Sequence, residues 1–191
     1  GDIVLFSGKD TISNVIKVVT FSKWSHVGMV LRQPDYDFVL LWESTTLSNL
    51  KDIEDGKAKH GVQLVNLRER LSTYEGDVAI RQLQNANIDD SPNMKKALID
   101  FRNEVRDRPF ETHLIDLIKS AIDCFGKFSE NMEDLSSLFC SELVAEAYQR
   151  LGLLAEVPDG EPSNEYTPKD FSRQLPLLKG ATLGPEIAVT I

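Results

Sequence analysis

The sequence predicts an α+β fold built around a small antiparallel sheet. At 191 residues the chain has the length of one domain and can bury a core of its own. Segments typical of strands fill the first 83 residues and segments typical of helices dominate the rest, an order that favours α+β over alternating β and α units. A turn at residues 33–35, where Pro34 cannot serve a central strand, joins two strands as an antiparallel hairpin.

Short apolar or alternating runs bounded by turn residues predict the strands. Residues 3–6 form an apolar run that stops at Ser7-Gly8. In residues 25–31 the side chains alternate, so one face carries Val27, Met29 and Leu31 and the other carries His26, Gly28 and Val30. Further strands are expected at residues 38–43, 60–67, 77–83 and 187–191. The charged stretch at residues 44–60 is expected on the surface, with acidic residues 52–55 in solvent, and residues 68–76 form a short polar stretch between two strands.

Apolar residues that recur every three or four positions predict helices at residues 12–19, 94–105, 110–125 and 136–151. The last is the clearest, because one of its faces carries Cys140, Leu143, Val144, Ala147 and Leu151. Ser136 or Ser137 is expected to cap this helix and Gly152 to end it, which puts Cys140 in about the first turn. After a loop at residues 158–168, a short helical turn is expected at residues 168–171.

Composition and charge exclude several classes of function. The formal net charge is −9 and no stripe of Lys and Arg is present, which argues against a general nucleic-acid binder and against docking on anionic membranes by charge alone. No run approaches 18 apolar residues, so no membrane-spanning segment is predicted. The start of the chain is typical of a strand rather than of a signal peptide. His60 and His113 lack partners at metal-binding spacing, and we predict no metal and no cofactor.

Three polar residues lie where burial makes polar groups costly: His26, Glu43 and Cys140. If Leu31 faces Phe38 in the hairpin, His26 lies opposite Glu43, and a shift of two residues still leaves them as diagonal neighbours on one face. A carboxylate beside an imidazole would orient it as the base for a thiol nucleophile. The alternatives are a buried core thiol at Cys140 and a cross-strand polar pair at His26 and Glu43.

Four segments occur in an order that resembles a known family. They are Gly1-Asp2-Ile3-Val4-Leu5, Trp24-Ser25-His26-Val27-Gly28-Met29-Val30, Trp42-Glu43-Ser44 and Phe139-Cys140-Ser141-Glu142-Leu143-Val144. The chain resembles the circularly permuted NlpC-like papain-fold hydrolases of the YiiX-like group, in which the strand with the histidine precedes the helix with the cysteine. The resemblance runs from about residue 1 to residue 171. Residues 84–135 match nothing in it, and we expect them to be a helical insertion within one domain, residues 1–191.

The resemblance implies a permuted papain-like fold, in which a small antiparallel sheet or barrel packs against the helix that bears the nucleophile. It implies that Cys140 is the nucleophile, His26 the general base and Glu43 the orienting residue of a catalytic triad. It also places the backbone N–H of Cys140 in an oxyanion hole. The second donor is not assigned, although Ser25, Tyr36 and Tyr166 can all donate. Cys124 has no histidine nearby in the sequence and is expected to be structural.

The predicted function is that of a thiol hydrolase or acyltransferase that acts on an amide or ester through an acyl-enzyme. The resemblance implies small-molecule, peptide-like or lipid substrates. The wide apolar stripe of residues 110–125 suits either a core helix or a cover for an acyl group. Two alternatives remain: a catalytically silent module that binds an amino acid or a lipid headgroup, and a secreted effector that modifies a host protein or lipid.

Overall fold

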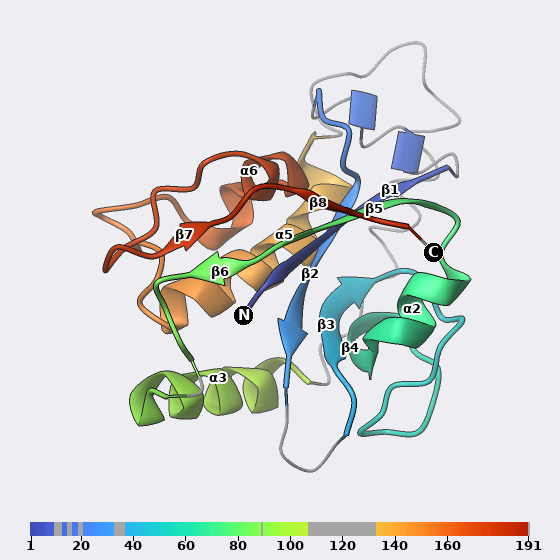
Figure 1. Cartoon of the computed structure of the whole chain (residues 1–191), viewed down its shortest axis with the longest axis horizontal. Coiled ribbons are helices and arrows are strands. Elements are labelled where there is room, and N and C mark those ends of the chain that lie inside the picture. Colours follow the sequence, from blue (N-terminus) through green and yellow to red (C-terminus); the bar gives the residue numbers. More distant parts are fainter. Residues whose placement is uncertain are drawn as a thin grey trace.

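A six-stranded antiparallel sheet, in the order β4-β3-β2-β1-β5-β8, forms the centre of the structure (Figure 1). The computed structural model describes residues 1–9, 13–14, 17–18, 21–32, 37–88, 90–106 and 133–190, with residues 133–139 described by backbone alone. The strands of the sheet are β1 Ile3–Gly8, β2 His26–Leu31, β3 Leu40–Thr45, β4 Gly61–Asn66, β5 Gly76–Arg81 and β8 Ile187–Val189. A second, two-stranded ladder pairs β6 Leu83–Gln84 with β7 Thr182–Leu183.

Helices cover both faces of the sheet. They are α2 Leu67–Thr73, α3 Pro92–Val105, α5 Glu133–Arg150, the short 3₁₀ helix η1 Ser163–Glu165 and α6 Pro168–Ser172. Figure 1 shows α5 running behind β1 and β2, and α2 beside β3 and β4. The α+β architecture predicted from the sequence is therefore confirmed. No helix in the described part of the chain is long and apolar enough to cross a membrane.

Alternate residues of the strands enter two separate apolar clusters, as the strand period of two requires. Val27, Met29 and Leu31 belong to the larger cluster, which also contains the buried face of α5. Val30 belongs to the smaller cluster, against which Leu67 and other residues of the α2 region pack. The two faces predicted for residues 25–31 are thus confirmed, and α5 and α2 lie on opposite faces of the sheet.

Helix α5 begins earlier than the capping pattern predicted. It starts at Glu133, so the expectation that Ser136 or Ser137 caps it is wrong, and Cys140 is its eighth residue rather than a member of its first turn. Its C-terminus agrees with the prediction: Gly152 has a φ of 64°. The N–H of Gly152 donates to Gln149 and that of Leu153 to Tyr148, the Schellman pattern that a left-handed glycine permits.

Two polar stretches between the predicted strands contain structure that the sequence did not predict. Residues 68–76 contain most of α2, whose N-cap Asn66 accepts a hydrogen bond from the N–H of Glu69 at 3.2 Å. Asp52 is buried, and its carboxylate accepts from the N–H groups of Glu54, Asp55 and Leu64. The prediction that all of residues 52–55 are solvated is therefore wrong for Asp52, since it organises the turn between β3 and β4.

Other sequence predictions agree with the structure to within a few residues. Strand β3 begins and ends two residues later than expected, whereas α3 begins two residues earlier, at Pro92, with Ser91 as its cap, and buries Phe101 and Val105. The turn at residues 33–35, the helix at residues 110–125 and most of the helix at residues 12–19 lie outside the described residues. So do Tyr36, His113 and Cys124.

Candidate active site

His26 and Glu43 meet across the hairpin of β2 and β3. Met29 pairs with Trp42, which shifts the register by two residues from the one that would put His26 directly opposite Glu43. The pair is therefore diagonal, the second of the two arrangements that the sequence allows. Nε2 of His26 lies 2.7 Å from Oε2 of Glu43. An ionised carboxylate only accepts hydrogen bonds, so Nε2 carries the proton and donates it.

Gly28 gives Glu43 its room in this register. The same pairing puts Gly28 across from Glu43, and a Cβ on Gly28 would lie 3.3 Å from Cβ of Glu43 and 3.2 Å from the carbonyl oxygen of Trp42. Both distances are shorter than ordinary packing contacts, and the backbone oxygen cannot move aside as a side chain can.

We expect Gly28→Ala to lower the free energy of unfolding by about 1–3 kcal/mol, the usual range for overpacking. It should also weaken the bond between His26 and Glu43, because β3 must move away from β2. Urea unfolding and the imidazole NMR signals of His26 would measure the two effects. Gly56→Ala tests the opposite case, since its Cβ would meet open space while its positive φ still adds backbone strain. If Gly56→Ala perturbs the His26 signals as much as Gly28→Ala does, the close approach is not the cause.

The carboxylate of Glu43 is held by a set of buried donors that the sequence did not reveal. Oε1 of Glu43 accepts from Nε of Arg70 at 2.8 Å and from Nε2 of Gln63 at 2.9 Å, and Nη2 of Arg70 lies 2.6 Å from the same oxygen. All three side chains are buried. Arg70 comes from α2, within the stretch at residues 68–76 that the sequence showed only as polar, and Gln63 faces Glu43 from the neighbouring strand β4.

Cys140 reaches the imidazole from the other side of this group. It is only 3% exposed, and its side chain makes a hydrogen bond with His26. Helix α5 packs against β2 and β3, which brings its eighth residue beside the first residue of β2. Because Glu43 takes Nε2, the nitrogen left for Cys140 is Nδ1. The three residues singled out in the sequence therefore form one chain of contacts, from thiol to imidazole to carboxylate.

The electrostatics of this chain favour charged forms of both His26 and Glu43. Burial alone would lower the pKa of His26, but the charge of Cys140 and hydrogen bonds to Cys140 and Glu43 raise it to about 9. Burial alone would raise the pKa of Glu43, but the hydrogen bond from His26 and the charge of Arg70 lower it to about 2. At neutral pH the site thus holds an imidazolium beside a carboxylate.

These shifts predict how stability depends on pH. The pKa of His26 rises from 6.5 to about 9 on folding, so its contribution is complete below pH 6.5 and is lost as pH rises through 9. The pKa of Glu43 falls from 4.5 to about 2, so its contribution is complete above pH 4.5 and is lost as pH falls through 2. We expect urea unfolding to show a loss of stability between pH 6.5 and 9 that is smaller in His26→Ala. Equal losses in both proteins would contradict this.

Two expectations about an oxyanion hole do not agree with the structure. As the eighth residue of α5, Cys140 has its N–H in the helix interior, where the acceptor is the carbonyl four residues earlier. Ser25 uses its hydroxyl on the backbone, accepting from the N–H of Gly8 at 3.1 Å and donating to the carbonyl of Phe6. Tyr166 is buried near α5, and its carbonyl accepts from Ser141 at 2.6 Å.

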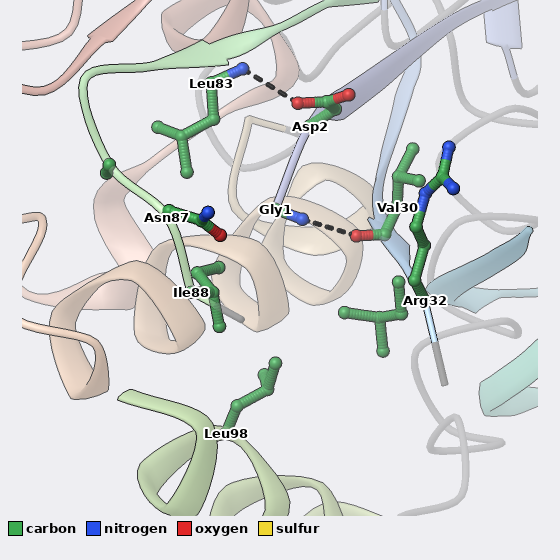
Figure 2. Close-up of a pocket in the computed structure, with 10 residues that line it drawn as sticks. Gly1, Asp2, Val30, Arg32, Leu83, Asn87, Ile88 and Leu98 are labelled. Carbon is green, nitrogen blue, oxygen red and sulfur yellow. Dashed lines mark hydrogen bonds between the residues drawn. The ribbon is translucent and has the colours of Figure 1, made fainter. Parts of the chain in front are cut away.

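A cavity of about 240 Å³ lies at the far end of β1 and β2 from His26. Figure 2 shows it between Gly1, Ile88 and Leu98, beside the hydrogen bond from Gly1 to the carbonyl of Val30. Five residues of strand separate this end of β2 from His26, or roughly 17 Å, so the cavity does not adjoin the Cys140 thiol.

Within the described residues, no group of three or more His, Cys, Asp or Glu side chains could hold a metal ion.

The fold has similarity to solved structures but the sequence matches no described family. No protein-family model matches the sequence, and no curated protein matches it. Among solved structures, the chain is similar to the metalloprotein YiiX of Escherichia coli O157:H7, a DUF1105 protein, with 18% sequence identity and a TM-score of 0.49. The match covers 79% of this chain and 64% of that protein, so the chain spans somewhat less than two thirds of its length. YiiX is thus a structural neighbour of this chain at low sequence identity.

Proposed function

We propose that the protein is a thiol hydrolase or acyltransferase that acts on an amide or ester through a triad of Cys140, His26 and Glu43. One observation carries the proposal: side chains from three separate elements form a single chain of contacts, in which Glu43 and Cys140 are buried and His26 is 16% exposed, with the carboxylate on one ring nitrogen and the thiol on the ring's other side. Nucleophilic catalysis requires this order of groups, because the carboxylate fixes the ring that takes the proton from the nucleophile.

The chemistry follows from this order. Because His26 is an imidazolium at neutral pH, its Nδ1 already holds the proton of the Cys140 thiol, and the Cys140 thiolate attacks the substrate carbonyl. Collapse of the tetrahedral adduct breaks the bond to the leaving amine or alcohol, which takes the proton from His26, and leaves a thioester on Cys140. Water or a second acceptor then attacks the thioester and gives its proton to His26, and Cys140 leaves as the thiolate, which restores its ion pair with His26. Peptide-like amides and lipid esters both fit this scheme.

The order of helices and strands along the chain supports a more specific assignment of the α+β fold, as a permuted papain-like fold. The strand that bears His26 comes second in the chain, and the helix that bears Cys140 follows all but the last two short strands, β7 and β8. The antiparallel sheet packs its larger apolar cluster against this helix. We propose membership of the permuted NlpC-like group on these grounds together with the segments around His26 and Cys140.

The experiment that tests the proposal is acylation with an activated p-nitrophenyl ester, followed by peptide mapping. We expect a burst of p-nitrophenol and an acyl mass on the peptide that contains Cys140. The same reaction in Cys124→Ser serves as the control, because it removes the second cysteine and should leave the burst unchanged. Acylation confined to Cys124, or no burst in the wild type, would contradict the proposal.

One observation favours the second candidate, a catalytically silent module that binds an amino acid or a lipid headgroup. Cys140 is almost fully buried, and its N–H lies inside α5 rather than at the start of the helix. Alkylation separates the two candidates, since an imidazolium-paired thiolate reacts with iodoacetamide at pH 6 and an ordinary thiol reacts slowly. Slow alkylation of Cys140 together with saturable binding of a headgroup would favour the silent module.

A further inference from the structure

We infer that Arg70 is a positioning residue of the proposed active site: it holds one oxygen of Glu43 so that the other faces His26. The catalytic part of this inference rests on the proposed function. The part that concerns the charge and orientation of Glu43 concerns the free protein and stands independently of turnover.

The two oxygens of Glu43 have separate partners. Oε1 faces Nε and Nη2 of Arg70 and the amide of Gln63, whereas Oε2 faces His26. Arg70 is itself fixed, because its Nη1 donates to Oδ1 of Asn49 at 2.8 Å. Because Arg70 and Gln63 hold Oε1, the carboxylate of Glu43 cannot rotate to exchange its two oxygens, and Oε2 stays hydrogen-bonded to Nε2 of the ring. The ring is thereby held with Nδ1 toward Cys140.

Arg70 also supplies the only group of fixed charge in this set of contacts. The groups that face the carboxylate are His26 from β2, the neutral Gln63 from β4 and Arg70 from α2, and Cys140 from α5 lies behind His26. The charges of His26 and Cys140 change when a proton moves between them, whereas a guanidinium keeps its proton in proteins. Arg70 therefore keeps the buried carboxylate ionised while the proton moves during the proposed reaction.

The contacts that run from Arg70 through Glu43 and His26 to Cys140 connect the two faces of the sheet. Cys140 belongs to the larger apolar cluster with α5, and α2 packs on the smaller cluster. Glu43 and His26 lie between them on β3 and β2. A residue of α2 is thus placed to set the geometry at a thiol on the opposite face, although the two side chains need not touch.

The experiment compares Arg70→Met and Arg70→Lys with a matched control, Arg81→Lys. Arg81 is also buried, but it donates only to the backbone carbonyls of Phe171, Arg173, Leu183 and Gly184, so its loss weakens the fold away from Glu43. The carboxyl carbon NMR signal of Glu43 is followed against pH in each free protein. The rate of acylation by the p-nitrophenyl ester is then measured from pH 4 to pH 9, with kcat and KM separated.

In Arg70→Met we expect the pKa of Glu43 to rise above its value of about 2, because burial is then opposed only by the hydrogen bond and charge of His26 and the hydrogen bond of Gln63. The acid limb of the acylation rate should move to higher pH. The value of kcat should fall by about 10- to 100-fold with little change in KM, as is typical when an outer partner of a catalytic group is removed. Arg70→Lys should restore the charge but only part of the rate, since a lysine lacks the planar fork.

Arg81→Lys should lose stability without moving the acid limb. If Arg70→Met and Arg81→Lys change the pH profile alike, or if the Glu43 signal titrates in Arg70→Met as in the wild type, the inference is wrong. The two proposals fail separately: a wild type that is never acylated, but whose Glu43 titration moves only in the Arg70 variants, would refute the hydrolase and leave the positioning role standing. Should Arg70→Met not fold, the comparison uses kcat: a loss in Arg70→Lys no larger than that in Arg81→Lys would overturn the inference.

Discussion

Replacing His26 with alanine is expected to lower the rate of Cys140 acylation by about 10²- to 10⁴-fold, the range that a positioned general base contributes. The imidazole is the group in contact with both the thiol and the carboxylate, so its loss removes both the proton acceptor and the positive charge that favours the thiolate. The alkylation of Cys140 by iodoacetamide at pH 6 should slow as well. Burst kinetics and mass spectrometry would measure these two rates.

His60→Ala is the matched control for this prediction. His60 is exposed, and its ring nitrogen Nδ1 lies 2.7 Å from the carbonyl of Thr46, on the loop between β3 and β4. Its replacement removes a histidine without touching the site and should leave both rates within a factor of about two, as is usual for a surface change. A wild-type rate in His26→Ala would mean that another group takes the proton from Cys140.

Replacing Glu43 with glutamine is expected to lower the free energy of unfolding by about 3–5 kcal/mol, because it leaves the guanidinium of Arg70 buried without its carboxylate. The amide that replaces the carboxylate also directs donors at Arg70 or His26, where the wild type has acceptors. The rate of acylation should fall as well, since His26 loses the partner that fixes its ring. Urea unfolding at pH 6 measures the first effect and burst kinetics the second.

Two further variants identify the cause of the lost stability. In the double variant Glu43→Gln, Arg70→Met both charges are absent, so it should be more stable than the sum of its single changes predicts. Glu54→Gln removes a carboxylate that pairs with Arg102 at 2.8 Å near the surface, and it should cost less than about 1 kcal/mol. A loss for Glu43→Gln no larger than that for Glu54→Gln would show that the buried pair contributes little.

The sequence could predict that His26 and Glu43 lie on the same face of the sheet, because any even-numbered shift in the strand register leaves both side chains on that face. Strand side chains alternate, so a shift of two residues leaves both on one face, and the structure has such a shift. The inward direction of Cys140 was predictable for a similar reason, since helical periodicity fixes the face wherever the helix begins. The start of α5 was not, because Ser136 and Ser137 are tolerated inside helices and nothing in the sequence stops α5 from reaching back to Glu133.

The residues missed by the sequence analysis are charged groups whose partners are distant in the sequence. Arginine and aspartate side chains usually lie in solvent. Arg70 is buried because it pairs with the carboxylate of Glu43, and Asp52 is buried because it accepts hydrogen bonds from backbone N–H groups. Asp52 meets the N–H groups of its own turn and that of Leu64, a pairing fixed by the fold of β4. The periodic pattern of apolar residues does not indicate which distant residues will contact a charged side chain, so these partners become visible only in the folded structure.

The spacing of these residues along the chain has a consequence for the order of folding. His26 and Arg70 lie 17 and 27 residues from Glu43, so the carboxylate, the ring and the guanidinium can assemble from short loops within the first strands. Cys140 is more than a hundred residues from His26, and the larger loop closes at a greater entropic cost. We therefore expect the thiol to join the other three groups last, when α5 docks. Under the proposed function, a truncated chain that lacks α5 would hold a base with no nucleophile and should be inert.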